Sequence, residues 1–350
     1  MVTLLIYGAN GYTGELIARR AVAEGLRPIL AGRSSKAVGV LAKELELEHR
    51  VFGLDDSAAL DAGLRGVHAA LHCAGPFART YRPMVDACVR NGAHYLDITG
   101  EVAVLEGLAA RDAEARSARI MVLPGVGFDV VPSDCLAAHL KGRLPSATHL
   151  TLGFQALNTP SRGTAMTIVE GIHRGGLVRR NGVLTRVPAA WKTRVIDFGA
   201  GPTKAFTIPW GDVSTAYHST GIPNVEVYIA DSRGQLQAAR ISRYFGWALG
   251  SSLVQGLLKQ RIRSGPAGPG AAERAQGRSY LWGEAADGNG RTVVARLQGP
   301  EGYTLTALTA VAVLKRVLAG DAPAGFQTPS KAYGSDFILG IEGVSRVDDR

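Results

Sequence analysis

Three glycines at a regular spacing form the first candidate site for chemistry. Gly8, Gly11 and Gly14 follow an apolar run at Thr3–Tyr7 and open a helix-like segment at 11–23. Glycines at such a junction adopt dihedral angles that a side chain blocks, let a pyrophosphate approach the backbone, and let the helix lie close to the strand. The helix N-terminus offers unpaired N–H groups and a partial positive charge. The spacing therefore predicts a nucleotide site, with a tight turn that holds no ligand as the alternative.

Polar side chains in the same turn extend this predicted site. Asn10 and Thr13 carry short side chains that can reach phosphate oxygens, and Tyr12 between them is included in the site. The turn matters only in its context, which is a strand before it, a helix after it, and further strand–helix units downstream.

The end of the second expected strand, at 28–31, selects the type of nucleotide. An NAD site usually carries an acidic residue there for the ribose 2′-hydroxyl. This chain instead has Arg33, Ser34 and Lys36, and no acid. A guanidinium can stack on adenine and pair with a 2′-phosphate, and the serine and lysine can complete the anion pocket. We therefore predict NADP(H) as cofactor, in preference to NAD(H); a basic helix start on the surface is the alternative.

Two later strand ends add candidate contacts, because ligands of such sheets lie at the carboxyl ends of the strands. Asp55 follows the third expected strand and either accepts from the adenine amino group or caps the next helix. The fourth strand is followed by a loop of small residues and a proline that can lie against a nicotinamide ribose, or form only a rigid turn. This loop consists of Cys73, Ala74, Gly75, Pro76 and Phe77. We expect Cys73 to pack rather than act as a nucleophile, since no activating base is identifiable beside it.

A nicotinamide cofactor exchanges hydride, and such chemistry often requires a proton donor near the reacting atoms. Tyr95, Asp97 and Asp129 lie near the ends of the fifth and sixth expected strands, and are the catalytic candidates. Each has a structural alternative, in which it orders a loop or caps a helix. Glu101, which closes the loop after the fifth strand, has the same two interpretations.

The expected substrate contacts lie further along the chain. Gly127 and Phe128 stand where the chain crosses into its second half, and we expect them on the substrate side. Arg162, Gly163 and Thr164 either bind an anionic group at a helix start or simply begin an ordinary capped helix.

The order of the expected elements predicts the fold that must position these residues. Short apolar runs alternate with helical patterns through the first 129 residues, which indicates right-handed βαβ units. Longer β-like runs follow, with a hairpin turn at Asp287–Gly290. We predict an α/β fold: a Rossmann-type doubly wound parallel sheet at 1–129, and a second α+β domain with a mostly antiparallel sheet at 130–300. The segment 301–350 is expected to return to the first domain.

Composition narrows the classes of protein. With 350 residues, 46% hydrophobic and 20% charged, the chain has enough apolar surface for a folded core. Its three cysteines and eight histidines show no metal-ligand spacing, so no metal site is predicted. Charge alone would support nucleic-acid binding, which we do not expect. No secretory signal pattern is visible, and we expect a cytoplasmic protein.

The net charge of +9 is concentrated locally. Residues 233–278 hold eight Lys or Arg and one acid, Glu273. Within this stretch, 240–263 mixes cations with aromatic and aliphatic residues. The pattern is typical of a helix at a membrane surface or of an entrance for a lipid-like substrate. A helix packed in the second domain, or at a homodimer interface, is the alternative.

Several motifs occur in a fixed order along the chain. They are GANGYTG at 8–14, AGR at 31–33, CAGPF at 73–77, YLDITGE at 95–101, GFDVVPSD at 127–134, GPEGYT at 299–304 and TP at 328–329. In this order they resemble the saccharopine dehydrogenase-like (saccharopine reductase-like) oxidoreductases, which include trans-acting enoyl reductases. The match covers the first 135 or so residues well and the last 50 or so moderately.

The resemblance implies an NADP(H)-dependent reductase of a C=C, C=N or C=O bond in a small or carrier-bound substrate. Known members act on imine-forming amino acids or on enoyl groups. A protein that binds NADP(H) without catalysis, or that associates with a lipid surface, is the alternative.

Overall fold

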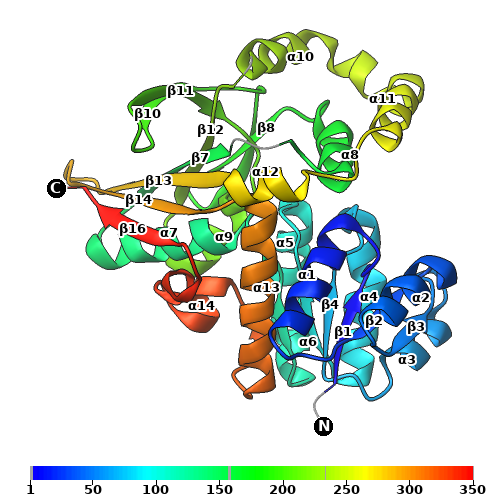
Figure 1. The fold of residues 1–350 in the computed structure, drawn as a ribbon. Coiled ribbons are helices and arrows are strands. Elements are labelled where there is room, and N and C mark those ends of the chain that lie inside the picture. The colour runs from blue at the N-terminus through cyan, green and yellow to red at the C-terminus, as the bar shows by residue number, and fades with distance from the viewer. Residues whose placement is uncertain (1–2, 157–158, 233, 350) are drawn as a thin grey trace. The chain divides into compact units, whose positions relative to one another are not determined.

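The computed structural model describes residues 3–156, 159–232 and 234–349, and the chain divides into two compact units. The first unit comprises Met1–Val131 and Tyr303–Ala332, and the second comprises Pro132–Gly302 and Tyr333–Arg350. Each unit contains its own sheet (Figure 1). Arg233, the first residue of the predicted basic stretch, lies outside the described residues.

The first unit is built on a parallel sheet, as the alternating pattern predicted. Its strands stand in the order β15 (Gly325–Phe326), β6 (Met121–Leu123), β5 (His94–Asp97), β4 (Ala69–His72), β1 (Leu4–Tyr7), β2 (Ile29–Gly32) and β3 (His49–Val51). The central strand β1 is buried along its whole length, because helices cover both faces of a sheet made from βαβ crossovers. The order reverses at β1, so the carboxyl end of β1 is the topological switch point at which ligands bind in such sheets.

Helices connect and cover these strands. They are α1 (Tyr12–Ala23), α2 (Ser35–Glu44), α3 (Ser57–Leu64), α4 (Phe77–Asn91), α5 (Val102–Ala109), α6 (Asp112–Ser117), α13 (Gly302–Leu318) and most of α14 (Pro329–Tyr333). Between β5 and β6 the chain forms two helices, α5 and α6. Helix α4 begins at Phe77 and contains Pro83.

The second unit contains a mixed, mostly antiparallel sheet, as predicted. Its main path runs β10 (Thr193–Asp197), β11 (Pro202–Thr207), β12 (Asn224–Ala230), β7 (His149–Ala156), β13 (Arg278–Ala286), β14 (Thr292–Pro300) and β16 (Ser345–Asp348), with β8 (Gly176–Arg180) and β9 (Val183–Val187) branching from β12. Only the β12–β7 pair is parallel among the pairings of the described residues in this sheet. The predicted hairpin joins β13 to β14, and the Asp287 carboxylate accepts from the backbone N–H groups of Asn289 and Arg291.

The helices of this unit are α7 (Val131–Arg143, which begins at the end of the first unit), α8 (Arg162–Gly171), α9 (Asp212–Thr220), α10 (Gln235–Leu249), α11 (Ser252–Ser264) and α12 (Ala271–Gln276), followed by a 3₁₀ turn at Phe337–Gly340. Over the described part of the chain, no helix combines the length and the apolar character needed to cross a membrane.

The second unit begins at Pro132, and the tail of the chain is divided between the two units. The predicted third segment, 301–350, was expected to return to the first domain as a whole. Residues 303–332 do belong to the first unit, where β15 extends the parallel sheet beside β6. The last residues instead belong to the second unit, because β16 pairs with β14.

The approach of α1 to β1 depends on two glycines. Gly8 has a φ of +80°, and a Cβ built there would lie 2.9 Å from the backbone nitrogen of Ala74. A Cβ on Gly14 would lie 2.3 Å from the carbonyl oxygen of Gly8. Both neighbours are backbone atoms, which cannot rotate away as a side chain can. The helix and the strand therefore meet at this distance only because these positions lack side chains.

Replacement of Gly14 tests this packing. We expect Gly14→Ala to lower the free energy of unfolding by about 1–3 kcal/mol, since α1 must move away from the Gly8 carbonyl. Gly39→Ala is the matched control: a Cβ there lies 3.6 Å from its nearest neighbour. Alanine at that helical position should stabilise the protein by up to about 1 kcal/mol. Equal urea midpoints for Gly14→Ala and the wild type would contradict the close approach.

Candidate cofactor-binding site

The start of α1 forms the centre of the predicted phosphate site. Gly11 is the N-cap residue of the 12-residue helix α1, and it has no side chain with which to cap the helix. The turn is held by hydrogen bonds from Gly8 N to Ala31 O (2.8 Å) and from Gly11 N to Gly8 O (3.0 Å). A glycine-lined helix start directly after a strand is the arrangement that receives a phosphate in such sheets.

The other predicted residues of the turn lie beside this helix start. Asn10 is exposed, and its Oδ1 would lie 3.0 Å from a Cβ on Gly32 at the end of β2. The ring of Tyr12 packs edge-on against that of Tyr303, with centroids 5.1 Å apart. Tyr303 belongs to the GPEGYT motif and opens α13, so the returning helix of the first unit contacts the predicted phosphate turn. Sequence analysis identified the motif but not this contact.

Two cations after β2 have no partner in the part of the chain that the structure describes. Arg33 and Lys36 are exposed, and neither side chain has a hydrogen bond or ion pair with any described residue. Ser34 is the N-cap of α2, and its hydroxyl accepts from Ala37 N at 3.3 Å. The strand end thus carries two unneutralised positive charges beside a helix N-terminus, as an anion site requires.

The charges after β2 and β3 gather around one buried tyrosine. Tyr7 donates to the carbonyl of Phe52 (3.1 Å). Burial raises the pKa of Tyr7, while nearby Arg33 lowers this pKa and nearby Asp55 raises it. Arg33 and Asp55, which stand 22 positions apart in the sequence, are therefore both close to the carboxyl end of β1.

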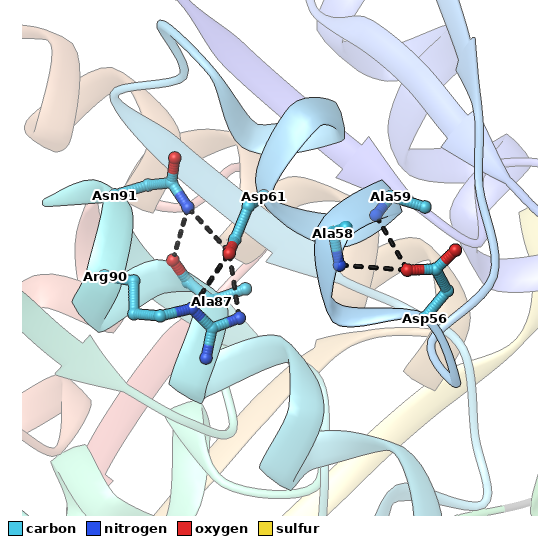
Figure 2. A network of polar contacts seen from close by, with 7 residues as sticks. All are labelled: Asp56, Ala58, Ala59, Asp61, Ala87, Arg90 and Asn91. Atoms are coloured by element: carbon cyan, nitrogen blue, oxygen red, sulfur yellow. Dashed lines mark hydrogen bonds and ion pairs between the residues drawn. The ribbon is translucent and has the colours of Figure 1, made fainter.

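Two roles were left open for Asp55, a contact to adenine or a helix cap. The cap of α3 is formed by the next residue, Asp56. The Asp56 carboxylate accepts from Ala58 N (2.9 Å) and Ala59 N (3.1 Å) (Figure 2). Figure 2 also shows how α3 is fixed to α4: Asp61 accepts from the Arg90 guanidinium and from the Asn91 amide. Asp55 is exposed and has no hydrogen bond to a described residue, so its carboxylate remains accessible to a ligand.

The loop after β4 is bound by an acidic residue from a different loop, the one that follows β5. Both oxygens of Glu101 accept backbone hydrogen bonds, from Phe77 N (2.8 Å) and Ala78 N (2.9 Å). Glu101 therefore caps α4, which explains why this helix begins at Phe77. It is also the N-cap residue of α5, though its side chain makes no cap there. The N-terminus of α4 is thus already neutralised by a carboxylate.

The remaining residues of this loop are held by Thr80. Its hydroxyl donates to the Ala74 carbonyl (2.7 Å) and lies 2.9 Å from Nε2 of His72. The Gly75–Pro76 peptide is cis. Burial raises the pKa of the Cys73 thiol well above its usual range, so the group stays protonated. This supports a packing role for Cys73 over a nucleophilic one.

Tyr95 and Asp97 form a buried pair. Both residues are fully buried, and the Tyr95 hydroxyl donates to Oδ2 of Asp97 at 2.7 Å. Oδ1 of Asp97 accepts from Thr99 N and Gly125 N, both at 2.9 Å. The carboxyl group thus ties the loop after β5 to the loop after β6. With both oxygens engaged, Asp97 is better placed to position these loops than to reach a substrate.

Asp129 differs from that pair in its exposure. It is half-buried at the end of the loop after β6, and burial raises its pKa to about 6. A Cβ on Gly100 would lie 3.0 Å from Oδ2 of Asp129, so the two loops meet here. The preceding residues pack on α13: Phe128 N donates to Oγ1 of Thr306 (3.0 Å), and a Cβ on Gly127 would lie 2.8 Å from Cγ2 of Thr306. Thr306 is a contact that sequence analysis did not identify.

The predicted anion contact at 162–164 lies in the second unit and has the contacts of a capped helix. Ser161 is the N-cap of α8 and accepts from Thr164 N (3.3 Å). The Arg162 guanidinium donates to the Gly265 carbonyl, at 2.9 and 2.6 Å, and Gly163 follows within the first turn. These contacts favour the second of the two interpretations. Among the described residues, no group of three His, Cys, Asp or Glu side chains is placed to hold a metal ion.

Comparison with known proteins shows what the first part of the chain is similar to. Residues 4–123 match the family model of the saccharopine dehydrogenase NADP binding domain. Over 216 residues the chain is 24% identical to a saccharopine dehydrogenase-like oxidoreductase of Mus musculus, covering 56% of this chain and 46% of the relative. Over its first part, the chain is therefore similar to the saccharopine dehydrogenase-like oxidoreductases. It spans about half the length of the curated relatives it matches.

Two further similarities extend the comparison. A trans-acting enoyl reductase of Mycobacterium leprae is 35% identical over 143 residues, which are 37% of this chain and 33% of that protein. Apo saccharopine dehydrogenase (L-Glu forming) from Saccharomyces cerevisiae superimposes over the whole of both chains with a TM-score of 0.68 at 13% identity. At this identity the superposition shows a common fold: a Rossmann-like sheet followed by a mixed, mostly antiparallel one.

The unpartnered guanidinium after β2 provides a direct test of cofactor type. Charge-assisted hydrogen bonds contribute about 1.5–3 kcal/mol each, so Arg33→Ala should weaken NADPH binding roughly tenfold to a hundredfold. NADH binding should change little, because NADH lacks the 2′-phosphate. The control is Arg65→Ala, which removes another exposed and unpartnered arginine of the same unit. An unchanged ratio of NADPH to NADH affinity, measured by calorimetry, would refute the assignment.

The buried pair predicts a pH dependence of stability. Burial raises the pKa of Asp97 to about 6 in the folded protein, against 3.8 for an unperturbed carboxyl. The folded state therefore holds the proton more tightly than the unfolded state, and ionisation of Asp97 should cost about 3 kcal/mol of stability as the pH rises from about 4 to above 6. Asp97→Asn keeps an acceptor for Thr99 and Gly125 but cannot ionise.

We expect this variant to be at least as stable as the wild type at pH 7.5, and to lose less stability between pH 5 and pH 7.5. Urea unfolding at the two pH values measures both quantities. If Asp97→Asn instead destabilised the protein more at pH 7.5 than at pH 5, Asp97 would have to be ionised and stabilised by its hydrogen bonds.

Proposed function

We propose that the chain is an NADP(H)-dependent reductase that transfers hydride to a C=C, C=N or C=O bond of a small or carrier-bound substrate. One observation carries the proposal: the glycine-lined start of α1 lies at the switch point of the sheet, and the neighbouring strand end bears Arg33 and Lys36, whose side chains pair with no described residue. The first feature suits a pyrophosphate, and the second suits a 2′-phosphate. The match to an NADP-binding family model supports both assignments.

The residues divide the work of binding by chemical type. Backbone N–H groups of the turn 8–14 receive the pyrophosphate, and Arg33 and Lys36 neutralise the additional phosphate. Asp55 offers an accessible acceptor for the adenine amino group. The loop 73–77, held by Thr80, supplies small residues against which the nicotinamide ribose can lie.

The bound cofactor supplies the hydride, so the protein must supply position and a proton. Asp129 fits the second task best among the three candidates. Its carboxyl is half-buried rather than sealed, and with a pKa of about 6 it still holds a proton on a fraction of molecules near neutral pH. Asp97 accepts hydrogen bonds from Thr99 N and Gly125 N and so fixes two loops. One of these loops carries Asp129, and the other carries Gly100, which lies close to Asp129 in space.

The relatives suggest where to begin with substrates. One similar protein is a trans-acting enoyl reductase and another is a saccharopine dehydrogenase. Enoyl thioesters and imines formed from amino acids are therefore the first two classes of acceptor to offer, with simple ketones as a third. NADPH oxidation by any of them would support the proposal. Tight NADPH binding without turnover of any acceptor would favour the non-catalytic alternative.

The proton donor is tested by Asp129→Asn in the enzyme that turns over the best acceptor. Loss of a general acid should lower kcat by about 10²–10⁴, while the Kd for NADPH stays unchanged. The wild-type rate should fall as the pH rises above about 6, because the proton is lost, and this limb should be absent from the variant. Asp321→Asn, on the loop after α13, is the control. An unchanged kcat in Asp129→Asn would exclude this residue as the donor.

A further inference from the structure

The second unit exposes several large apolar side chains on two consecutive helices. Tyr244 is 79% exposed and Trp247 81% exposed on α10, and Leu253 is 74% exposed on α11. Phe245 and Leu257 are also exposed. We refer to these five side chains as the α10–α11 face. Within these two helices, which are described throughout, Leu236 of α10 is the only buried residue.

The helices that carry this face are fixed from beneath by polar contacts. The Gln255 amide donates to the Val169 carbonyl (2.8 Å), and Lys259 pairs with Glu170 (2.7 Å), which ties α11 to α8. The Arg243 guanidinium donates to the carbonyls of Ala189 and Ala190, both at 2.6 Å. Figure 1 shows α8, α10 and α11 of this unit grouped together. Anchoring through polar groups leaves the large apolar groups pointing away from the core, which is the reverse of ordinary helix packing.

The charge around the face has one sign. Residues 235–264 carry five cations and no acid. Three of these cations, Arg240, Arg261 and Arg263, are exposed and make no side-chain hydrogen bond or ion pair with a described residue. A surface that combines apolar and aromatic groups with unpaired cations is complementary to a lipid surface, which has an apolar hydrocarbon interior and anionic headgroups.

A hollow beside the α10–α11 face is also lined by an unpaired cation. It has a volume of about 420 Å³ and is lined in part by His173, Arg174, Arg243 and Tyr244. The Arg174 guanidinium is exposed and has no partner among the described residues. The hollow thus adds another unpaired cation at the edge of the face, at a place where a headgroup phosphate can be received.

Charge also argues against a second copy of the chain as the occupant. A twofold interface places the same patch against itself, which would bring two sets of three unpaired arginines together without a carboxylate from α10 or α11 of either copy. Such an arrangement would be repelled, whereas anionic headgroups would be attracted by about 1 kcal/mol per cation near the surface. Tryptophan and tyrosine are moreover the residues enriched at the boundary between headgroups and hydrocarbon.

We propose that the α10–α11 face docks on the surface of a membrane containing anionic lipid, with α10 and α11 lying in the plane of the headgroups. Trp247, Tyr244 and Leu253 enter the acyl boundary, and Arg261 and Arg263 pair with lipid phosphates. The proposal is independent of the reductase function, because docking requires neither cofactor nor turnover.

Sedimentation of the full chain with vesicles tests the proposal without any activity assay. We expect binding to phosphatidylcholine vesicles in which about a third of the lipid is phosphatidylglycerol, weaker binding to pure phosphatidylcholine, and a decrease with added salt. Arg261→Gln with Arg263→Gln should weaken binding about tenfold or more. The matched control, Arg65→Gln with Arg119→Gln, neutralises two exposed arginines of the first unit and should change binding only slightly.

Insertion of the apolar side chains is tested separately. Trp247→Ser with Leu253→Ser should abolish binding, whereas Val195→Ser, which replaces another exposed apolar residue of the second unit, should not. Brominated acyl chains should quench tryptophan fluorescence in the wild type, and this quenching should be lost in Trp247→Phe. NADPH binding and the urea midpoint of each variant show that it is folded.

Three outcomes would overturn the proposal: no sedimentation at low salt, equal sedimentation of Trp247→Ser with Leu253→Ser and the wild type, or quenching that persists in Trp247→Phe. A dimer that is broken by the serine variant, in a protein that ignores vesicles, would assign the face to a second copy instead.

Discussion

The absence of two side chains at the junction of β1 and α1 is the constraint on which the candidate site depends. Carbonyl and amide groups of Gly8 and Ala74 occupy the space that Cβ atoms at Gly14 and Gly8 would need. This lets α1 start directly after the switch point of the sheet, with a glycine at its N-cap position. The positive end of the helix, the cations after β2 and the acceptor at Asp55 can then serve one extended anionic ligand. A larger residue at Gly14 would move α1 and separate its N-terminus from the cations after β2 and from Asp55.

Three acids near the carboxyl ends of β5 and β6 show how surroundings assign different tasks to the same functional group. Glu101 gives both oxygens to the backbone of α4 and neutralises that helix start. Asp97 is sealed in the core, where its hydrogen bonds join two loops. Asp129 retains partial exposure, and burial brings its pKa to about 6. Position within the loops, rather than residue type, separates a cap, a loop tether and a candidate proton donor.

The second unit adds a surface with a different physical character. The first unit concentrates unpaired charge at strand ends, where backbone groups complete an anion site. The α10–α11 face instead combines unpaired cations with side chains that would be buried in an ordinary helix pair. A reductase that docks on lipid would have access to acyl substrates that are poorly soluble in water, which is compatible with the carrier-bound class of acceptor proposed above.

The sequence alone determined the parallel sheet, the glycine turn, the absence of an acid after β2 and the second, mostly antiparallel domain. Each of these follows from local periodicity, or from residue types within a few positions of one another. It did not determine that Glu101 caps α4, that Asp56 rather than Asp55 caps α3, that Tyr303 and Thr306 contact the loops of the first unit, or that β16 joins the second sheet. Those features join residues that are distant in the chain, or depend on which of two adjacent carboxylates faces a helix. Only the folded arrangement of the backbone decides such contacts, because the energy of a cap or a ladder hydrogen bond depends on a geometry that residue order does not specify.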